Sequence, residues 1–100
     1  MIRGTTPTHI FKIPFDTSLI KEVKITYAQG NEIILTKTTE DCEIENNAIK
    51  TTFTQEDTFK FDSEKHVQLQ IRILTADGNA LASTVRHIDV ERCLDDEVLA

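Results

Sequence analysis

Residues 65–75 read KHVQLQIRILT, and this stretch decides the fold class. In its centre every second residue is apolar, namely Val67, Leu69, Ile71 and Ile73. The residues between them are polar. Because successive side chains of a β-strand point to opposite faces, this alternation predicts a strand with one dry and one solvated face. Residues 22–28 repeat the pattern with Val23, Ile25 and Tyr27, so a second strand is expected there.

Turn signals divide the rest of the chain into further short strands. Residues 29–31 (QGN), 46–47 (NN) and 76–79 (ADGN) indicate hairpin turns, because Gly, Asn and Asp tolerate the backbone conformations that tight turns require. The strands expected beside these turns cover residues 10–15, 32–37 (around Ile33 and Leu35), 42–45, 48–53 and 81–90. Residues 39–41 (TED) are expected to interrupt the chain between two of them.

Two segments depart from the strand pattern. Thr54 followed by Gln-Glu-Asp resembles a helix-capping sequence, which predicts one helical turn over residues 55–59. Residues 16–19 (DTSL) predict a side-chain-stabilised turn or a single 3₁₀ turn. Pro7 and Pro14 flank the first strand, and because proline donates no ladder hydrogen bond, that strand should lie at a sheet edge or switch sheets.

About seven short strands without a long helix predict an all-β fold, a two-sheet antiparallel sandwich of immunoglobulin-like architecture. The Cys…Trp…Cys core of true immunoglobulin domains is missing, because the chain has no Trp. A small closed barrel is the alternative fold. Residues 1–92 are expected to form the domain, and residues 93–100 an acidic C-terminal tail. The tail holds Leu94, Val98 and Leu99, which either fray with it or form an interface.

Composition limits the classes of function. The chain has 100 residues and a net charge of −6, so binding to nucleic acid through phosphate neutralisation is not expected. No stretch is apolar enough to span a membrane, and the first residues lack the apolar run of a secretory signal, so synthesis in the cytosol is expected. Cys42 and Cys93 should then be free thiols.

The residues that could carry chemistry form no recognisable site. His9, His66 and His87 lack the spacing of a metal-ligand pair, and the turn with Asp77 and Asn79 does not match a calcium-binding loop. Acidic residues cluster at 40–45 and 95–97 and predict a solvated surface. No catalytic, cofactor-binding or metal site is therefore expected. The many threonines follow from β-propensity, or mark edges that pair with another chain.

Several segments together resemble a group of small proteins encoded in phage and prophage tail modules of Gram-positive hosts. They are residues 1–8 (MIRGTTPT), 15–20 (FDTSLI), 27–29 (YAQ), 54–61 (TQEDTFKF), 70–72 (QIR), 77–78 (DG) and 82–83 (AS). The resemblance runs from residue 1 to about residue 92. These proteins are loosely similar to the immunoglobulin-like N-terminal module of upper-baseplate proteins.

The resemblance implies a non-enzymatic structural or adaptor component of a phage tail or baseplate. Its partners would be other tail or baseplate proteins and copies of itself, and its location the host cytoplasm and then the virion. No catalytic or binding residue belongs to the resembling pattern. The alternative is a module that binds host-surface carbohydrate or peptide on its loops. A small enzyme is the third hypothesis, which requires ionisable groups to converge in a pocket.

Overall fold

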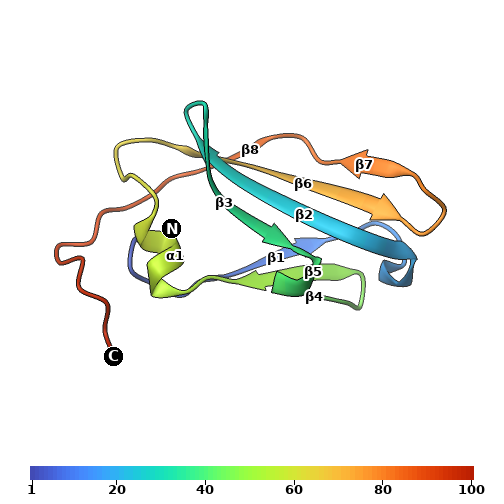
Figure 1. Ribbon diagram of the computed structural model, residues 1–100, viewed down its shortest axis with the longest axis horizontal. Helices are drawn as coiled ribbons and strands as arrows, with labels where there is room; N and C mark the ends of the chain where they lie inside the picture. Colours follow the sequence, from blue (N-terminus) through green and yellow to red (C-terminus); the bar gives the residue numbers. More distant parts are fainter.

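The computed structural model describes residues 1–100 and consists mainly of β-strands (Figure 1). The elements in chain order are β1 (Thr8–Lys12), η1 (Thr17–Leu19), β2 (Ile20–Gln29), β3 (Glu32–Thr38), η2 (Thr39–Asp41), β4 (Cys42–Glu45), β5 (Ala48–Thr52), α1 (Gln55–Phe59), β6 (Val67–Thr75), β7 (Ala80–Ala82) and β8 (Arg86–Ile88). The two η elements are single 3₁₀ turns. No helix is both long and apolar enough to cross a bilayer.

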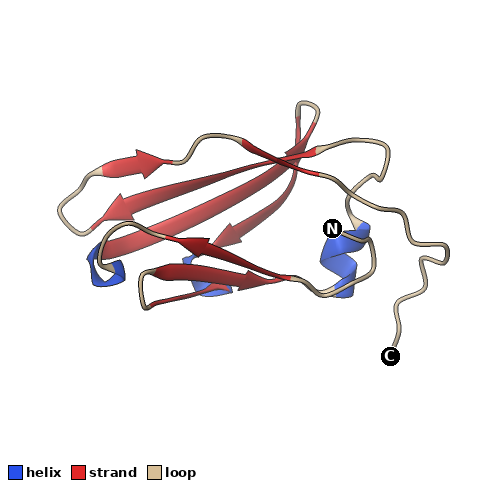
Figure 2. Ribbon diagram, turned by 180° about the vertical axis from the view of Figure 1, so that it is seen from behind, coloured by secondary structure: helices blue, strands red, loops and turns tan.

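The strands form two antiparallel sheets that face each other (Figures 1 and 2). One sheet has the order β1-β5-β4. The other has the order β3-β2-β6, and β7 and β8 pair in succession with the far side of β6. The predicted two-sheet sandwich is thus confirmed, and the closed barrel is wrong because no strand pairs across the two sheets. β1 lies at a sheet edge, as the flanking prolines predicted.

The connectivity is that of an immunoglobulin sandwich. In that fold strands A, B, E and D form one sheet, and strands C, F and G, extended by C′, form the other. Here β1, β5 and β4 occupy the positions of B, E and D, while β3, β2, β6 and the β7–β8 pair occupy those of C′, C, F and G. No strand occupies the position of A beside β1, so the edge of β1 is open.

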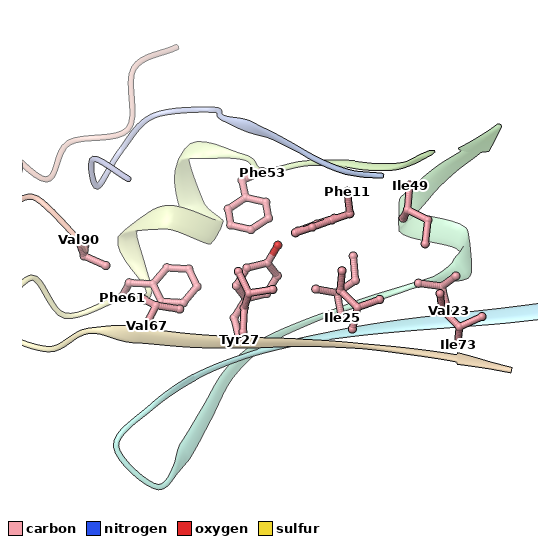
Figure 3. Packing of buried hydrophobic residues seen from close by; sticks show 12 residues of the cluster. Phe11, Val23, Ile25, Tyr27, Ile49, Phe53, Phe61, Val67, Ile73 and Val90 are labelled. Atoms are coloured by element: carbon pink, nitrogen blue, oxygen red, sulfur yellow. The ribbon is translucent and has the colours of Figure 1, made fainter. Parts of the chain in front are cut away.

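Twelve buried apolar residues fill the space between the sheets (Figure 3). Tyr27 and Leu69 are register partners on β2 and β6, and both point into this core. The Tyr27 ring crosses toward the opposite sheet and meets Phe53 edge-on at 5.0 Å between ring centroids (Figure 3). Phe53 in turn stacks on Phe61 at 6.4 Å. The alternating pattern that predicted the strands therefore also identified their buried faces.

Most predicted turns form for the expected reasons. Asn46 and Asn47 have φ angles of +52° and +59°, the left-handed conformation that a two-residue hairpin turn requires. In α1, Thr54 Oγ1 accepts a hydrogen bond from the Asp57 backbone N–H, and Asp57 Oδ2 accepts one from the Thr54 N–H. This capping box confirms the predicted helical turn. The 3₁₀ turn over residues 17–19 is also confirmed.

The expectation of one last strand over residues 81–90 is wrong. The chain pairs with β6 in two pieces, because Arg86 follows Ala82 by four positions where their partners on β6 are three apart. At this interruption the Ser83 hydroxyl accepts a hydrogen bond from the Ile71 N–H and replaces a ladder carbonyl. The extra residue is typical of a β-bulge, which re-aims the strand. Val85 consequently lies exposed.

Two further boundaries differ from expectation. The first strand covers Thr8–Lys12, so it begins two residues before and ends three residues before the expected range 10–15. It ends there because the last backbone bond to its partner is the 2.8 Å one from the Ile13 N–H to Asn47 O. In β3 the register shifts by one residue at Ile34. This bulge turns Ile33 outward, where it is 66% exposed, while Leu35, the other apolar residue at the centre of the predicted strand, is half-buried.

Candidate functional site

The open edge of β1 is the first element of the candidate site. The Phe53 N–H donates to Pro7 O at 2.9 Å and the Ile13 N–H donates to Asn47 O at 2.8 Å. Because bonding direction alternates along an antiparallel pair, the odd-numbered residues of β1 face β5. The backbone N–H and C=O groups of the even-numbered residues, Thr8, Ile10 and Lys12, therefore point away from the sheet. These groups have no partner strand and form a template for an added strand.

A groove runs beside this edge, between β1 and the β7–β8 edge of the opposite sheet. Its apolar lining comes from both sheets and includes Phe11, Ile13, Ile71, Ile73 and Leu81. This part of the groove has a volume of about 270 Å³. A second hollow of about 330 Å³, which also touches β1 and β8, extends it along the same side. The missing strand beside β1 thus leaves apolar side chains accessible between the sheets.

The groove is positively charged although the protein is acidic overall. Lys12 and Arg86 are the charged residues of the apolar part of the groove, and no Asp or Glu lines it or its extension. Both side chains are exposed, and neither forms an ion pair or a side-chain hydrogen bond. In a chain of net charge −6, two unpaired cations beside apolar side chains favour a ligand that is acidic and apolar.

His9 lies at the extension of the groove and also contacts the core. Its Nδ1 is hydrogen-bonded to the buried hydroxyl of Tyr27 at 2.9 Å. Burial lowers the pKa of His9 below its ordinary value, and the same effect raises the pKa of Tyr27. Both groups are therefore neutral near pH 7. This pair joins β1 to β2 and holds β1 against the core.

The tail residues predicted as an interface lie at the α1 end of the sandwich, away from the core. Leu94 is 90% exposed, Leu99 76% and Val98 44%. The backbone of Leu99 exchanges two hydrogen bonds with the Gln55 side-chain amide, at 2.8 and 2.9 Å. The tail backbone is thus held, while its apolar side chains face solvent. The interface itself stays a prediction.

Arg3 is the second residue that holds the tail. Its guanidinium donates to Phe61 O at 2.8 Å and to Phe59 O at 3.1 Å, and it pairs with Asp96 at 3.0 Å. Phe59 is the last residue of α1 and Phe61 lies two residues beyond it, so Arg3 satisfies carbonyl acceptors at the end of the helix. The contact with Asp96 is the exposed part of this arrangement, because that carboxylate is largely in solvent.

The other residues considered for chemistry remain apart. His66 pairs with the exposed Asp89 at 2.7 Å, and His87 lies exposed on β8. No group of three His, Cys, Asp or Glu side chains is arranged to hold a metal ion. Asp77 accepts a hydrogen bond from Thr75 within its own turn. Cys42 and Cys93 are unpaired, and burial raises the pKa of the Cys42 thiol.

The sequence alone did not identify the groove. Its cations are Lys12, in a strand, and Arg86, in a segment predicted to be one continuous strand, and nothing in their local sequence places them together. The one sequence signal was the pair of prolines, Pro7 and Pro14, which predicted an edge but not an open one.

The comparisons with known proteins add little to this geometry. No protein-family model matches the chain, and no curated protein matches it. Among solved structures it is similar to the V domain of amphioxus IgVJ-C2, at 14% sequence identity over 89% of this chain and 95% of that chain, with a TM-score of 0.31. At these values the likeness carries no inference about function. The immunoglobulin-like assignment rests on the strand order described above.

Proposed function

We propose that this protein is a non-enzymatic adaptor domain that works by protein–protein contact, and that it serves in the tail or baseplate of a phage or prophage. The observation that supports the contact function most directly is the unpaired edge of β1 beside an apolar groove. Exposed strand edges are normally short, charged or covered, because they pair readily with other chains. The tail or baseplate setting is supported by the sequence resemblance alone.

The ionisable groups that could support catalysis are separate from each other, as described for the three histidines. The carbohydrate-binding alternative is less well supported, because sugar sites commonly use exposed aromatic rings. Of the six aromatic residues, Tyr27, Phe53 and Phe61 are fully buried and Phe11 nearly so, while Phe15 and Phe59 are half-buried and none is fully exposed.

The test measures the mass of the protein in solution and its direct binding to tail and baseplate proteins. The full chain is measured by size-exclusion chromatography with light scattering. It is then used in pull-downs against purified tail and baseplate proteins encoded beside its gene. We expect self-association or capture of at least one of these proteins. A chain that stays monomeric and binds none of them would refute the proposal.

A matched pair of variants links the result to the edge. The Ile10 N–H points away from β5, so Ile10→Pro removes a donor from the open edge without removing a ladder bond. Ile10→Val keeps this donor and serves as the control. We expect Ile10→Pro to weaken the contact and Ile10→Val to leave it intact. Circular dichroism checks that both variants keep their strands.

A further inference from the structure

The acidic C-terminal tail carries carboxylates, which are missing from the lining of the groove. The groove offers apolar side chains, two unpaired cations and free backbone groups along β1. The tail, residues 93–100 (CLDDEVLA), offers three exposed apolar side chains, three carboxylates and a backbone outside any strand. The groove cations Lys12 and Arg86 are complementary in charge to the carboxylates of the tail.

The period of the tail sequence also fits an added strand. In an extended segment Leu94, Asp96 and Val98 share one face, while Asp95 and Glu97 share the other. The first face places two apolar side chains against the apolar lining, with a carboxylate between them for Arg86. The second face directs two carboxylates toward the outer side of the sheet, where Lys12 lies.

The length of the tail is sufficient. The outward backbone groups of β1 span Thr8 to Lys12, so a partner strand needs about five residues, and the tail has eight. Within one copy the tail is held at the α1 end by Gln55 and Arg3. These contacts involve an exposed amide and an exposed carboxylate, so exchange to another site disrupts no part of the core.

We infer that the groove beside β1 binds residues 93–100 of a second copy of this chain as an added antiparallel or parallel strand. This inference rests on the proposed contact function and names a second copy as the partner. Each copy carries one groove and one tail, so the contact is heterologous. Two copies that exchange tails form a closed dimer. Copies that pass their tails head to tail form a ring if the rotation between them closes, and a filament if it does not.

The test reverses charges on each side of the contact in the full chain. Arg86→Glu together with Lys12→Glu alters the groove, and Asp96→Lys together with Asp95→Lys alters the tail, so that each reversed cation has a reversed carboxylate opposite it. Sedimentation equilibrium gives the dissociation constant for self-association. We expect each altered chain alone to associate at least about tenfold more weakly than the wild type, because like charges then meet across the contact. An equimolar mixture of the two altered chains should regain association.

Matched controls carry the same charge changes elsewhere. Lys21→Glu together with Lys24→Glu controls for the groove, because both are exposed lysines in β2 that form no ion pair. Glu43→Lys with Glu45→Lys controls for the tail, because both are exposed on β4. The controls should associate as the wild type does. Regained association in the mixture also shows that the altered chains are folded.

The outcomes separate this inference from the proposed function. Association that none of the groove or tail variants changes overturns the inference and leaves the contact function standing. A monomeric wild type that captures a tail or baseplate protein through the Ile10 edge likewise overturns the inference alone. A monomeric wild type that captures nothing overturns both.

Discussion

Removing the Asp57 carboxylate should destabilise the fold far more than removing the Lys37 ammonium, although the two groups form one ion pair. Lys37 extends from β3 into the space between the sheets, and its Nζ lies 3.1 Å from Asp57 Oδ2 and 3.2 Å from Thr52 O. It also lies over the Phe53 ring, 5.1 Å from the centroid. Only 11% of the Lys37 side chain and 16% of the Asp57 side chain are exposed.

The asymmetry follows from what each group has left when the other is removed. Asp57→Ala removes half of the capping box, which should lower the free energy of unfolding by about 1 kcal/mol. It also leaves the buried Lys37 ammonium without its carboxylate partner, which should lower the free energy of unfolding by about 2 kcal/mol more. Lys37→Met keeps the apolar stem beside Phe53. In this variant the Asp57 carboxylate still accepts the hydrogen bond from the Thr54 N–H and still lies near Lys60. The free energy of unfolding should therefore fall by about 1 kcal/mol or less.

The double variant supplies the decisive comparison. When Lys37→Met is added to Asp57→Ala, the stranded charge disappears, so the double variant should be about 1–2 kcal/mol more stable than Asp57→Ala alone. Urea denaturation at pH 7, followed by circular dichroism and by fluorescence of the buried Tyr27, measures the free energies of unfolding. A double variant no more stable than Asp57→Ala would refute the reasoning, as would equal losses in the two single variants.

Two further predictions concern backbone strain and pH. Gly4→Ala should lower the free energy of unfolding by about 1–3 kcal/mol in urea denaturation. The reason is that Gly4 has a φ of +78° and that a Cβ there would meet the Phe59 ring at 2.5 Å. An unchanged free energy of unfolding would show that the N-terminal segment does not pack on α1. Burial opposes ionisation of Asp57, yet its bonds from the Thr54 N–H and the Lys37 ammonium outweigh burial and lower its pKa below the ordinary 3.8. The stability that Asp57 contributes is therefore fully present above about pH 4 and is lost as the pH falls through its folded pKa, so thermal melts of the wild type and Asp57→Asn should differ less at pH 2 than at pH 7; an equal difference at both pH values would contradict this assignment.

The local features of the fold were readable from the sequence because they depend on neighbouring residues. The alternation in residues 65–75 predicted both the strand β6 and its buried face. Thr54 with Asp57, and Asn46 with Asn47, specified a helix start and a tight turn through bonds and dihedral angles within a few residues. The sandwich class followed from the number and spacing of such elements.

Features that depend on distant residues were missed or misplaced. The bulge at Ile34 turns Ile33 toward solvent, and the Ser83 hydroxyl interrupts the last strand through a bond to Ile71, twelve residues away. Neither event leaves a local mark, because a serine or an isoleucine fits a regular strand equally well. The buried position of Lys37 likewise requires Asp57 on a helix beyond two further strands.

The amino-acid order by itself determined which segments are strands, where they turn and which of their faces avoid water, because these properties arise from side-chain period and backbone preference over a few residues. The tertiary structure alone decided that β1 has no outer neighbour, and that Lys12 and Arg86 line the same groove. The physical reason is that an edge, a groove and a charge cluster are relations between sheets, and packing sets these relations only when the whole chain has folded.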